Sequence, residues 1–380
     1  MELKEYRDQI DKIDVQIAEL FEKRMDASAG ISKYKKEHNI GVVDSGREKE
    51  VIENVTSHVR PEFSDDISML YSMIFNVSRN YQKKLSGSHS DLYPVIQDAI
   101  KNTPQLFPQT ANVACQGVEG AFSQLAAQKF FKHPKIMNFN TFESVFSAVE
   151  NGFCEYGVLP LENSSAGSVN KVYELMMTHD FSIVRGTRIK VDHYLLAKPG
   201  VKLEDIKEVY SHEQALNQCS EFLSGLKNVN AVACENTAVA ASMVSKSDRN
   251  DIAAIASRTC MDLYNLSCIK PSIQNRDNNY TRFICISKKL EIYPGADRTS
   301  LMMILPHRPG SLNMALSRFY SLGLNLIKLE SRPLPEREFE FMFYFDLETS
   351  IYSEEFLQMI DELDDMCEEF RYLGSYSEVI

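Results

Sequence analysis

The sequence lacks a long apolar run, an apolar leader and an excess of basic residues. No apolar run approaches the roughly 18–20 residues of a transmembrane helix. The first residues, MELKEYRDQIDKID, are charged and amphipathic, which argues against a signal peptide. The net charge of −12 argues against nucleic acid or an anionic membrane as the main partner, because phosphate binding requires a basic face. Small anionic substrates stay compatible with this charge, since a few local arginines can hold them.

Closely spaced cysteines are also absent. The eight cysteines are scattered, mostly among apolar residues, and none forms a C-x-x-C pair. This pattern is typical of reduced, buried thiols in a cytoplasmic protein. It predicts neither a disulfide framework nor a zinc site, so we expect no metal.

Length and composition predict a multidomain protein. The 380 residues suffice for two or three domains at roughly 100–200 residues each. Their 44% hydrophobic content supplies material for real cores. The sequence pattern changes along the chain, and the expected segments are an all-α helical domain at 1–88, a linker at 89–110, an α/β domain of two lobes at 111–290 and an α+β domain at 297–376.

The first segment predicts three helices. Apolar residues recur at three and four positions from Leu3 to Ile31, which indicates one amphipathic helix of more than 30 residues. Asp44 and Ser45 are expected to cap a second helix, and Ser64 to Asp66 a third. Such a long helix has little to pack against within one chain, so we expect a homodimer or a higher homo-oligomer.

The later segments predict two kinds of sheet. Between 111 and 290, short apolar strands alternate with helices, which predicts parallel sheets in two lobes with a ligand cleft at the carboxyl ends of the strands. Between 298 and 376, the expected order is βαββαβ, which is the ferredoxin-like unit.

Several basic residues stand out in the helical segment, although each alone is typical of a solvated helix charge. Arg24 and Lys35 are 11 positions apart, so they share a helix face roughly 16 Å apart and could clamp a small dianion. Arg7 lies roughly 25 Å from Arg24 on another face, and could reach the same ligand only from an antiparallel partner helix. Ser78 and Gln82 are side by side at i, i+4.

Residue types and spacings in this segment resemble those of the all-helical chorismate mutase family. The resemblance implies that Arg24, Lys35 and Arg7 of a second chain bind the carboxylates and the ether oxygen of chorismate. It implies that Lys35 and Gln82 are the catalytic pair at the breaking C–O bond, where restraint and charge replace a nucleophile. The residues that carry the resemblance are Arg7, Arg24, Lys35, Asp44, Arg47, Glu48, Ser78 and Gln82.

Four motifs stand out in the α/β segment: GVEGAFS from Gly117, PLENSSAG from Pro160, SHEQALNQC from Ser211 and NYTRF from Asn279. Each alone is compatible with an ordinary turn, and His212 is more typical of a helix cap than of a catalytic base. Together they resemble prephenate dehydratase, with Tyr280 and Glu213 as small departures from its usual pattern. The resemblance implies a periplasmic-binding-protein-like fold of two lobes and no cofactor.

The same resemblance implies the residues that bind and convert prephenate. Prephenate loses CO₂ and hydroxide together, so the protein must mainly help the hydroxide to leave. Thr281 is expected to be the catalytic donor or relay. The implied prephenate-binding residues are Asn163, Ser211, Gln218 and Thr281, with Arg282 beside them.

Two turns of the last segment resemble the ACT regulatory domain of this dehydratase family. They read GSL at Gly310, Ser311 and Leu312, and ESRP from Glu330 through Ser331 and Arg332. The resemblance implies that phenylalanine binds there, between two subunits, and inhibits the enzyme.

The sequence therefore predicts a bifunctional enzyme of phenylalanine biosynthesis, which makes prephenate from chorismate and phenylpyruvate from prephenate. Two alternatives stay open at this point. The chain could be a dehydratase alone, with the helical segment serving dimerisation. It could also be a non-catalytic sensor of amino acids or aromatic acids, because two-lobed clefts and ACT domains both occur in sensors.

Overall fold

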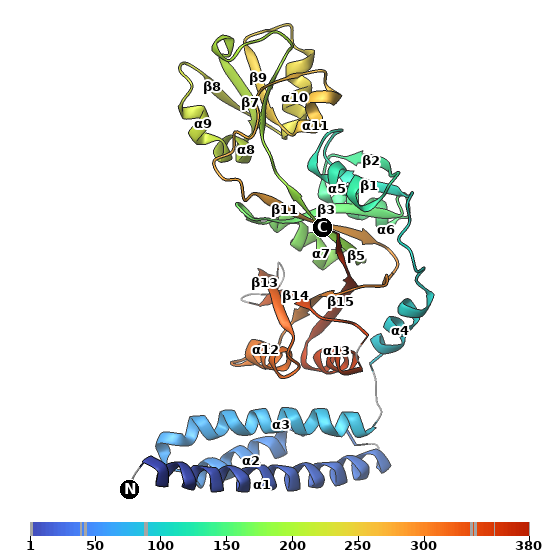
Figure 1. Ribbon diagram of the computed structural model, residues 1–380. Coiled ribbons are helices and arrows are strands. Elements are labelled where there is room, and N and C mark those ends of the chain that lie inside the picture. The colour runs from blue at the N-terminus through green and yellow to red at the C-terminus, as the bar shows by residue number, and fades with distance from the viewer. Residues whose placement is uncertain are drawn as a thin grey trace. The chain divides into compact units, whose positions relative to one another are not determined.

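The chain divides into two compact units, described in turn (Figure 1). The computed structural model describes residues 3–38, 40–41, 44–86, 90–334, 337, 340–352 and 354–379. The first unit holds residues 1–93, 308–318 and 357–366, and the second holds 94–307, 319–356 and 367–380. In the described ranges, every helix is too short or too polar to cross a bilayer.

Three helices build the N-terminal region, as predicted. They are α1 (Leu3–Glu37), α2 (Ser45–Ser57) and α3 (Ser64–Ser86). Asp44 caps α2, since its carboxylate accepts a hydrogen bond of 3.0 Å from the backbone N–H of Arg47. Both α1 and α2 pack against α3. Most apolar side chains of α1 nevertheless stay exposed, with Ile17 and Leu20 at 59% and 64%.

The expected linker contains a helix, α4 (Leu92–Asn102), but the residues after it belong structurally to the α/β region. The ring of Phe107 lies 5.0 Å from that of Phe131 and 4.8 Å from that of Tyr293, and the Arg185 guanidinium covers it at 4.1 Å. Thr103 accepts a hydrogen bond of 2.9 Å from the backbone N–H of Ile292. This part of the chain is therefore docked rather than a free spacer.

The first lobe is a mixed sheet in the order β16-β5-β11-β3-β1-β2, with β4 beside β3. The strands β1, β2 and β3 run parallel, but β11 is antiparallel to both β3 and β5. The prediction of purely parallel sheet is therefore wrong here, because β11 returns from the second lobe and enters in the opposite direction. The elements are β1 (Asn112–Gln116), α5 (Phe122–Phe130), β2 (Lys135–Phe139), α6 (Phe142–Glu150), β3 (Tyr156–Asn163), β4 (Gly167–Ser168), α7 (Asn170–Thr178), β5 (Ser182–Lys190), β11 (Tyr280–Ser287) and β16 (Glu378–Val379).

The second lobe is a five-stranded sheet in the order β10-β6-β9-β7-β8. Its β7 is parallel to β8 and β9, while β6 is antiparallel to β9 and β10. Residues 191–193 and 271–279 cross between the lobes. The elements are β6 (Tyr194–Ala197), β7 (Glu208–His212), α8 (Glu213–Gln218), α9 (Ser220–Ser224), β8 (Asn230–Cys234), α10 (Thr237–Lys246), β9 (Ile252–Ala256), α11 (Arg258–Leu263) and β10 (Ser267–Lys270).

The C-terminal strands form an antiparallel sheet in the order β13-β14-β12-β15, which the expected βαββαβ order produces. The elements are β12 (Arg298–Ile304), α12 (Ser311–Ser321), β13 (Asn325–Pro333), β14 (Phe341–Glu348), α13 (Glu354–Met366) and β15 (Glu369–Tyr376).

This sheet and the first lobe share one hydrophobic core, in which Tyr173 of α7 meets Tyr344 of β14 edge-on at 5.1 Å. The chain then crosses from β15 to β16, which pairs with β5. Gly374 allows the close approach, because a Cβ there would lie 2.4 Å from the carbonyl oxygen of Ile183. The sequence did not predict this connection.

The packing of Phe107 predicts a stability difference. Phe107→Ala should lower the free energy of unfolding of the α/β region by about 2 kcal/mol, because it exposes its aromatic neighbours. The measurement is the urea midpoint of unfolding, followed by circular dichroism. Leu106→Ala is the matched control, since Leu106 is 82% exposed, and equal midpoints for the two variants would contradict the docked role of this segment.

Candidate active sites

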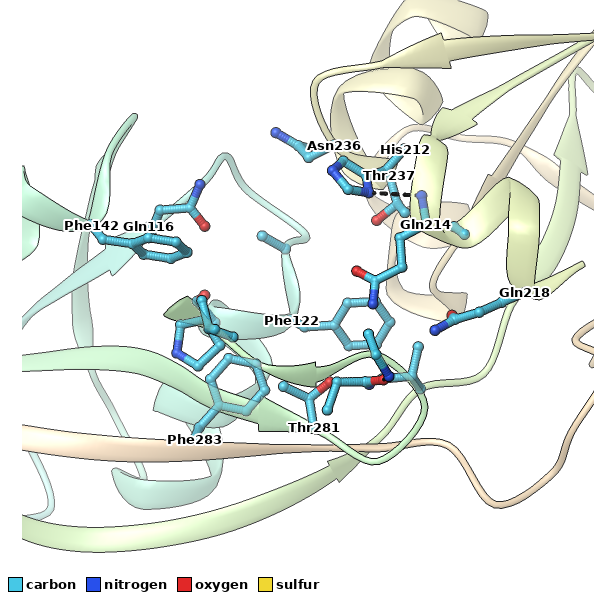
Figure 2. A pocket seen from close by; sticks show the side chains of 18 of the residues that line it. Gln116, Phe122, Phe142, His212, Gln214, Gln218, Asn236, Thr237, Thr281 and Phe283 are labelled. Atoms are coloured by element: carbon cyan, nitrogen blue, oxygen red, sulfur yellow. Dashed lines mark hydrogen bonds between the residues drawn. The ribbon is translucent and has the colours of Figure 1, made fainter. Parts of the chain in front are cut away.

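A cavity of about 580 Å³ lies between the two lobes. Figure 2 shows Gln116, Phe122 and Thr281 of the first lobe opposite His212 and Gln214 of the second. The cavity lies at the carboxyl ends of β1, β3 and β7, where ligands bind in sheets of this kind. Among the described residues, no group of three or more His, Cys, Asp or Glu side chains is placed to hold a metal ion.

Asn163 and Thr281 face each other across neighbouring strands at the cavity. They are register partners in the antiparallel pair β3–β11. The side-chain oxygen of Asn163, Oδ1, accepts hydrogen bonds from the backbone N–H groups of Ser165 and Ala166, at 3.0 and 2.9 Å. Because a backbone N–H can only donate, these bonds fix which end of the Asn163 amide is which. The Asn163 NH₂ group therefore points to Thr281 Oγ1, 2.9 Å away.

This arrangement orients the Thr281 hydroxyl. Its oxygen accepts from Asn163, so its proton can be donated to a ligand in the cavity. A threonine hydroxyl is a very weak acid, and its use in a reaction depends on such orientation. The predicted catalytic residue is thus placed at the cavity and held there by a neighbour that was also predicted.

The same network continues to two residues that sequence reasoning missed. The Asn163 NH₂ group donates to Asn279 Oδ1 at 2.8 Å, and Asn279 Nδ2 donates to Gln218 Oε1 at 3.0 Å. Gln218 Oε1 lies 2.8 Å from His193 Nε2, which must then carry a proton. Both missed residues lie on or beside the segments that cross between the lobes. Asn279 is the first residue of the NYTRF motif and so had a usable signal, whereas His193 stands in none of the four motifs.

His193 is buried, with 2% of its surface exposed, and lines the cavity. Its Nδ1 atom has no hydrogen-bond partner within the described part of the chain. Burial lowers the pKa of the imidazole, and the hydrogen bond to Gln218 only partly opposes this. The neutral ring thus presents an unprotonated Nδ1, because Nε2 holds the proton.

Two of the predicted prephenate-binding residues do not line the cavity. Ser211 is fully buried, and its hydroxyl donates to the Ile255 carbonyl at 2.6 Å. Arg282 points to the opposite face of β11 from Thr281, because alternate residues of a strand face opposite sides. Its guanidinium contacts Asp346 and donates to Tyr376 Oη at 2.9 Å. Burial lowers the pKa of Arg282, but Tyr376, Asp346 and Tyr344 outweigh this and raise the pKa above its ordinary value.

His212 caps α8, which agrees with the favoured interpretation of its motif. Its Nδ1 accepts a hydrogen bond of 3.2 Å from the backbone N–H of Gln214 (Figure 2). The ring also lines the cavity. The capping bond therefore gives His212 a structural role, and no catalytic role is needed to explain its place.

In the helical region, α1 and α3 bring part of the predicted mutase set together. Ser28 Oγ lies 2.6 Å from Ser78 Oγ, and Ser32 donates to the Gln82 carbonyl at 3.0 Å. Arg24 lies one turn before Ser28, with its guanidinium 5.6 Å from the centre of the Phe75 ring. Ser28 and Ser32 were missed, although two small polar residues at i, i+4 on an apolar face were a usable signal.

Two polar atoms in this region are buried and have no hydrogen-bond partner within the described ranges. They are Arg24 Nη1 and Gln82 Oε1. A buried guanidinium nitrogen without an acceptor favours binding of an anion, because unsatisfied buried donors are costly. Lys35 is half-buried on the same helix, eleven residues after Arg24.

The remaining predicted mutase residues are arranged around α2 and the start of α1. Arg47 is exposed and pairs with Glu50 at 2.9 Å, while Glu48 pairs with Arg79 of α3. Arg79 was not predicted. Arg7 is exposed on α1, seventeen residues before Arg24, and does not join the other predicted residues within one chain.

The GSL motif lies at the start of α12, and the ESRP motif lies at the end of β13. Gly310 has a φ of 86°, which favours glycine, and it precedes α12, where Ser311 and Leu312 begin the helix. Separately, β13 carries Glu330, Ser331 and Arg332, and Arg332 Nη2 lies 2.6 Å from Glu330 Oε1.

Comparison with protein families matches two parts of the chain. Residues 6–83 match the family model for chorismate mutase type II, and residues 113–291 match the model for prephenate dehydratase. These ranges enclose the predicted mutase set and the four dehydratase motifs.

Whole proteins are also similar. An arogenate dehydratase/prephenate dehydratase of Arabidopsis thaliana is 37% identical over 276 residues, covering 70% of this chain and 72% of the relative. A bifunctional chorismate mutase/prephenate dehydratase of Enterobacter agglomerans is 29% identical over 378 residues, covering 97% and 94%. The structure of a prephenate dehydratase from Arthrobacter aurescens, in complex with L-Phe, matches with a TM-score of 0.64 at 26% identity, covering 70% and 89%.

The buried His193 predicts a pH dependence of stability. Below its ordinary pKa of about 6.5 a histidine takes a proton in the unfolded chain, whereas folded His193 resists protonation until a lower pH. His193 therefore makes the fold lose stability as the pH falls through this window. His193→Asn should reduce the loss of melting temperature between pH 7 and pH 5, measured by calorimetry. His133→Asn, at an exposed position, is the control, and an unchanged pH dependence for His193→Asn would contradict the assignment.

Proposed function

We propose an assignment of residues to two active sites, on the premise that the chain belongs to the prephenate dehydratase family, in the bifunctional form that also carries a chorismate mutase. The protein is an enzyme with both activities. It rearranges chorismate to prephenate, and it decarboxylates and dehydrates prephenate to phenylpyruvate in phenylalanine biosynthesis. We assign the mutase to residues 1–88, the linker to 89–110, the dehydratase to 111–290 and a regulatory domain to 297–376.

The cavity between the lobes is the site of dehydration. The observation that carries this proposal is the Asn163–Thr281 pair at the cavity, in which Thr281 accepts from Asn163 and keeps its own proton for a ligand. The ring carboxylate leaves as CO₂, its bonding electrons enter the ring, and the ring expels hydroxide as it becomes aromatic. Thr281 donates a hydrogen bond to the departing oxygen, which lowers the barrier for a poor leaving group.

Other cavity residues hold the substrate. Gln218 offers its amide NH₂ group to a carboxylate or the keto group, whereas both N–H bonds of the Asn163 amide go to Thr281 and Asn279, so Asn163 acts through Thr281. The first turn of α5 begins at the cavity with Phe122 and Ser123, where the N-terminal end of a helix favours a carboxylate. Ser211 and Arg282 do not contact the substrate. They hold in place the ends of β7 and β11, which line the cavity. No step of this reaction requires a cofactor.

The mutase site lies between α1 and α3. The Arg24 guanidinium, whose Nη1 atom is buried, binds a carboxylate of chorismate, which supplies the acceptor that Nη1 lacks within the described residues. Lys35 and Gln82 act on the ether oxygen as its bond breaks. The other residues assigned to this site are Asp44, Arg47, Glu48 and Ser78, with Arg7 from a second subunit.

The exposed stripe of α1 supports a homodimer or a higher homo-oligomer. Ile10, Ile13, Ile17 and Leu20 are each more than half exposed, and they occupy one helix face. Such contiguous apolar surface is typical of a subunit interface. A second copy on this face would cover the stripe and could bring its Arg7 to the site of the first.

The C-terminal domain is proposed to be an ACT domain that binds L-phenylalanine and inhibits dehydration. The order of its sheet supports this, as does the L-Phe bound to the dehydratase from Arthrobacter aurescens. The binding residues are assigned to Gly310, Ser311, Leu312, Glu330, Ser331 and Arg332. A cytoplasmic location is proposed from the eight cysteines, all of which are described and are free thiols.

Separate sites predict separate losses of activity. Thr281→Ala should reduce conversion of prephenate about 100-fold or more, because it removes the donor, and leave chorismate turnover unchanged. Arg24→Ala should reduce chorismate turnover about 100-fold and leave prephenate conversion unchanged. One assay that follows both products from both variants checks this. Equal loss of the two activities in either variant would contradict separate sites.

The dimer proposal predicts an effect of charge on α1. Ile17→Glu should weaken subunit association and lower chorismate turnover at low protein concentration, because it places a carboxylate in the buried interface. Sedimentation over a dilution series measures the association. Gln16→Glu is the control, since it adds the same charge at the next position, about 100° around the helix. A dimer that is equally stable in both variants would contradict the proposal.

A further inference from the structure

A second pair of residues lies directly behind the catalytic pair in the same two strands. In the register of β3 and β11, Asn163 pairs with Thr281, and Glu162 pairs with Arg282. Because alternate residues of a strand face opposite sides, the second pair points away from the cavity. Any shift of Glu162 or Arg282 is transmitted through one peptide unit to the catalytic pair.

The C-terminal sheet holds this second pair from behind. Lys328 Nζ lies 2.5 Å from Glu162 Oε2, and the Arg282 guanidinium forms an ion pair with Asp346. Lys328 and Asp346 are themselves register partners, in β13 and β14. Arg282 also lies 3.5 Å from Glu162. Positive and negative side chains thus alternate in a row from Lys328 through Glu162 and Arg282 to Asp346, which we call the charge row.

Three of the four side chains of the charge row are shielded from water, whereas that of Glu162 is 31% exposed. The side chains of Arg282 and Asp346 are 4% and 0% exposed, and that of Lys328 is 12% exposed. Asp346 also accepts hydrogen bonds from Ser300 and from Tyr344, the latter at 2.7 Å. Ion pairs in such surroundings are directional and little screened by salt. They hold the two strands more rigidly than exposed pairs would.

Lys328 has a further contact on the strand that follows the catalytic turn. Its Nζ donates to Ser168 Oγ at 3.0 Å, and Ser168 donates to Glu330 Oε2 at 2.6 Å. Ser168 is the register partner of Glu162 in β3–β4, and its neighbour Gly167 is that of Asn163. One ammonium group therefore fixes both ends of the turn that orients the Asn163 amide.

We propose that Lys328 is a positioning residue for dehydration, which acts from the C-terminal sheet through Glu162 and Ser168 on the Asn163–Thr281 pair. The C-terminal domain is then part of the dehydratase active site and not only a separate binding domain for an effector. This proposal rests on the proposed roles of Asn163 and Thr281. A hydroxyl that is displaced by as little as about 1 Å can lose about 100-fold in rate.

The test uses the full chain and its two activities. Lys328→Met keeps the length and the apolar stem and removes the ammonium group. It should lower kcat for prephenate about 10- to 100-fold, with KM within about twofold, because the donor is misaligned while the binding groups stay. Chorismate turnover should not change, and the chain should stay folded at the assay temperature. Lys328→Arg should restore most of kcat, since a guanidinium can reach both Glu162 and Ser168.

Two further variants control for charge and for the route. Lys171→Met removes a lysine from the exposed pair with Glu174 on α7, at 3.5 Å, and should leave kcat unchanged. The double variant Lys328→Met, Glu162→Gln should lose no more activity than the worse of its two single variants, because both changes break the same contact.

Four results would overturn the proposal: an unchanged kcat in Lys328→Met, a rise in KM alone, a loss of both activities, or losses that multiply in the double variant. Thr281→Ala, measured in parallel, separates this proposal from the site assignment. If Thr281→Ala is inactive while Lys328→Met is normal, only the positioning role is wrong. If Thr281→Ala keeps its activity, the site assignment is wrong and the positioning role falls with it.

Discussion

The orientation of one amide group decides what the dehydratase site can do. Two backbone N–H groups, from Ser165 and Ala166, hold the oxygen of Asn163 and so turn its NH₂ group toward Thr281. A weak acid such as a hydroxyl contributes to catalysis only if its proton is aimed at the departing atom. This requirement explains why the polar NYTRF stretch stands at the start of a buried strand. Phe283 to Ser287 anchor the strand in the core, and Thr281 is thereby fixed at the cavity.

The sequence motifs predicted the residues that line the cavity better than they predicted the residues that hydrogen-bond to them. Asn163, Gln218 and Thr281 line one cavity, as the resemblance to prephenate dehydratase implied. His193 could not be predicted, since a segment that crosses between the lobes brings it to the site, whereas Asn279 begins the NYTRF motif and was missed. No local pattern encodes that crossing. Arg282 was expected to bind prephenate because of its place beside Thr281. Strand alternation instead turns it to the other face, where the C-terminal sheet supplies Asp346.

The fold was predicted well where periodicity is local and less well where pairing is distant. The three N-terminal helices and the strands from 298 to 376 lie close to the expected ranges. The antiparallel entry of β11 and the pairing of β16 with β5 depend on contacts between segments far apart in sequence. The same holds for the mutase region. The resemblance to chorismate mutase implied Arg24, Ser78 and Gln82, but the contacts of Ser28 and Ser32 with α3 required the packed helices.

The central claim is that an oriented hydroxyl at position 281 assists the departure of hydroxide. The most direct measurement is the single-turnover rate of phenylpyruvate formation at saturating prephenate for Thr281→Val and Thr281→Ser. Valine keeps the shape of threonine and lacks the donor, whereas serine keeps the donor. We expect Thr281→Val to be slower by about 100-fold or more, and Thr281→Ser to stay within about tenfold of the parent enzyme. A Thr281→Val enzyme that converts prephenate at the parent rate would contradict the account.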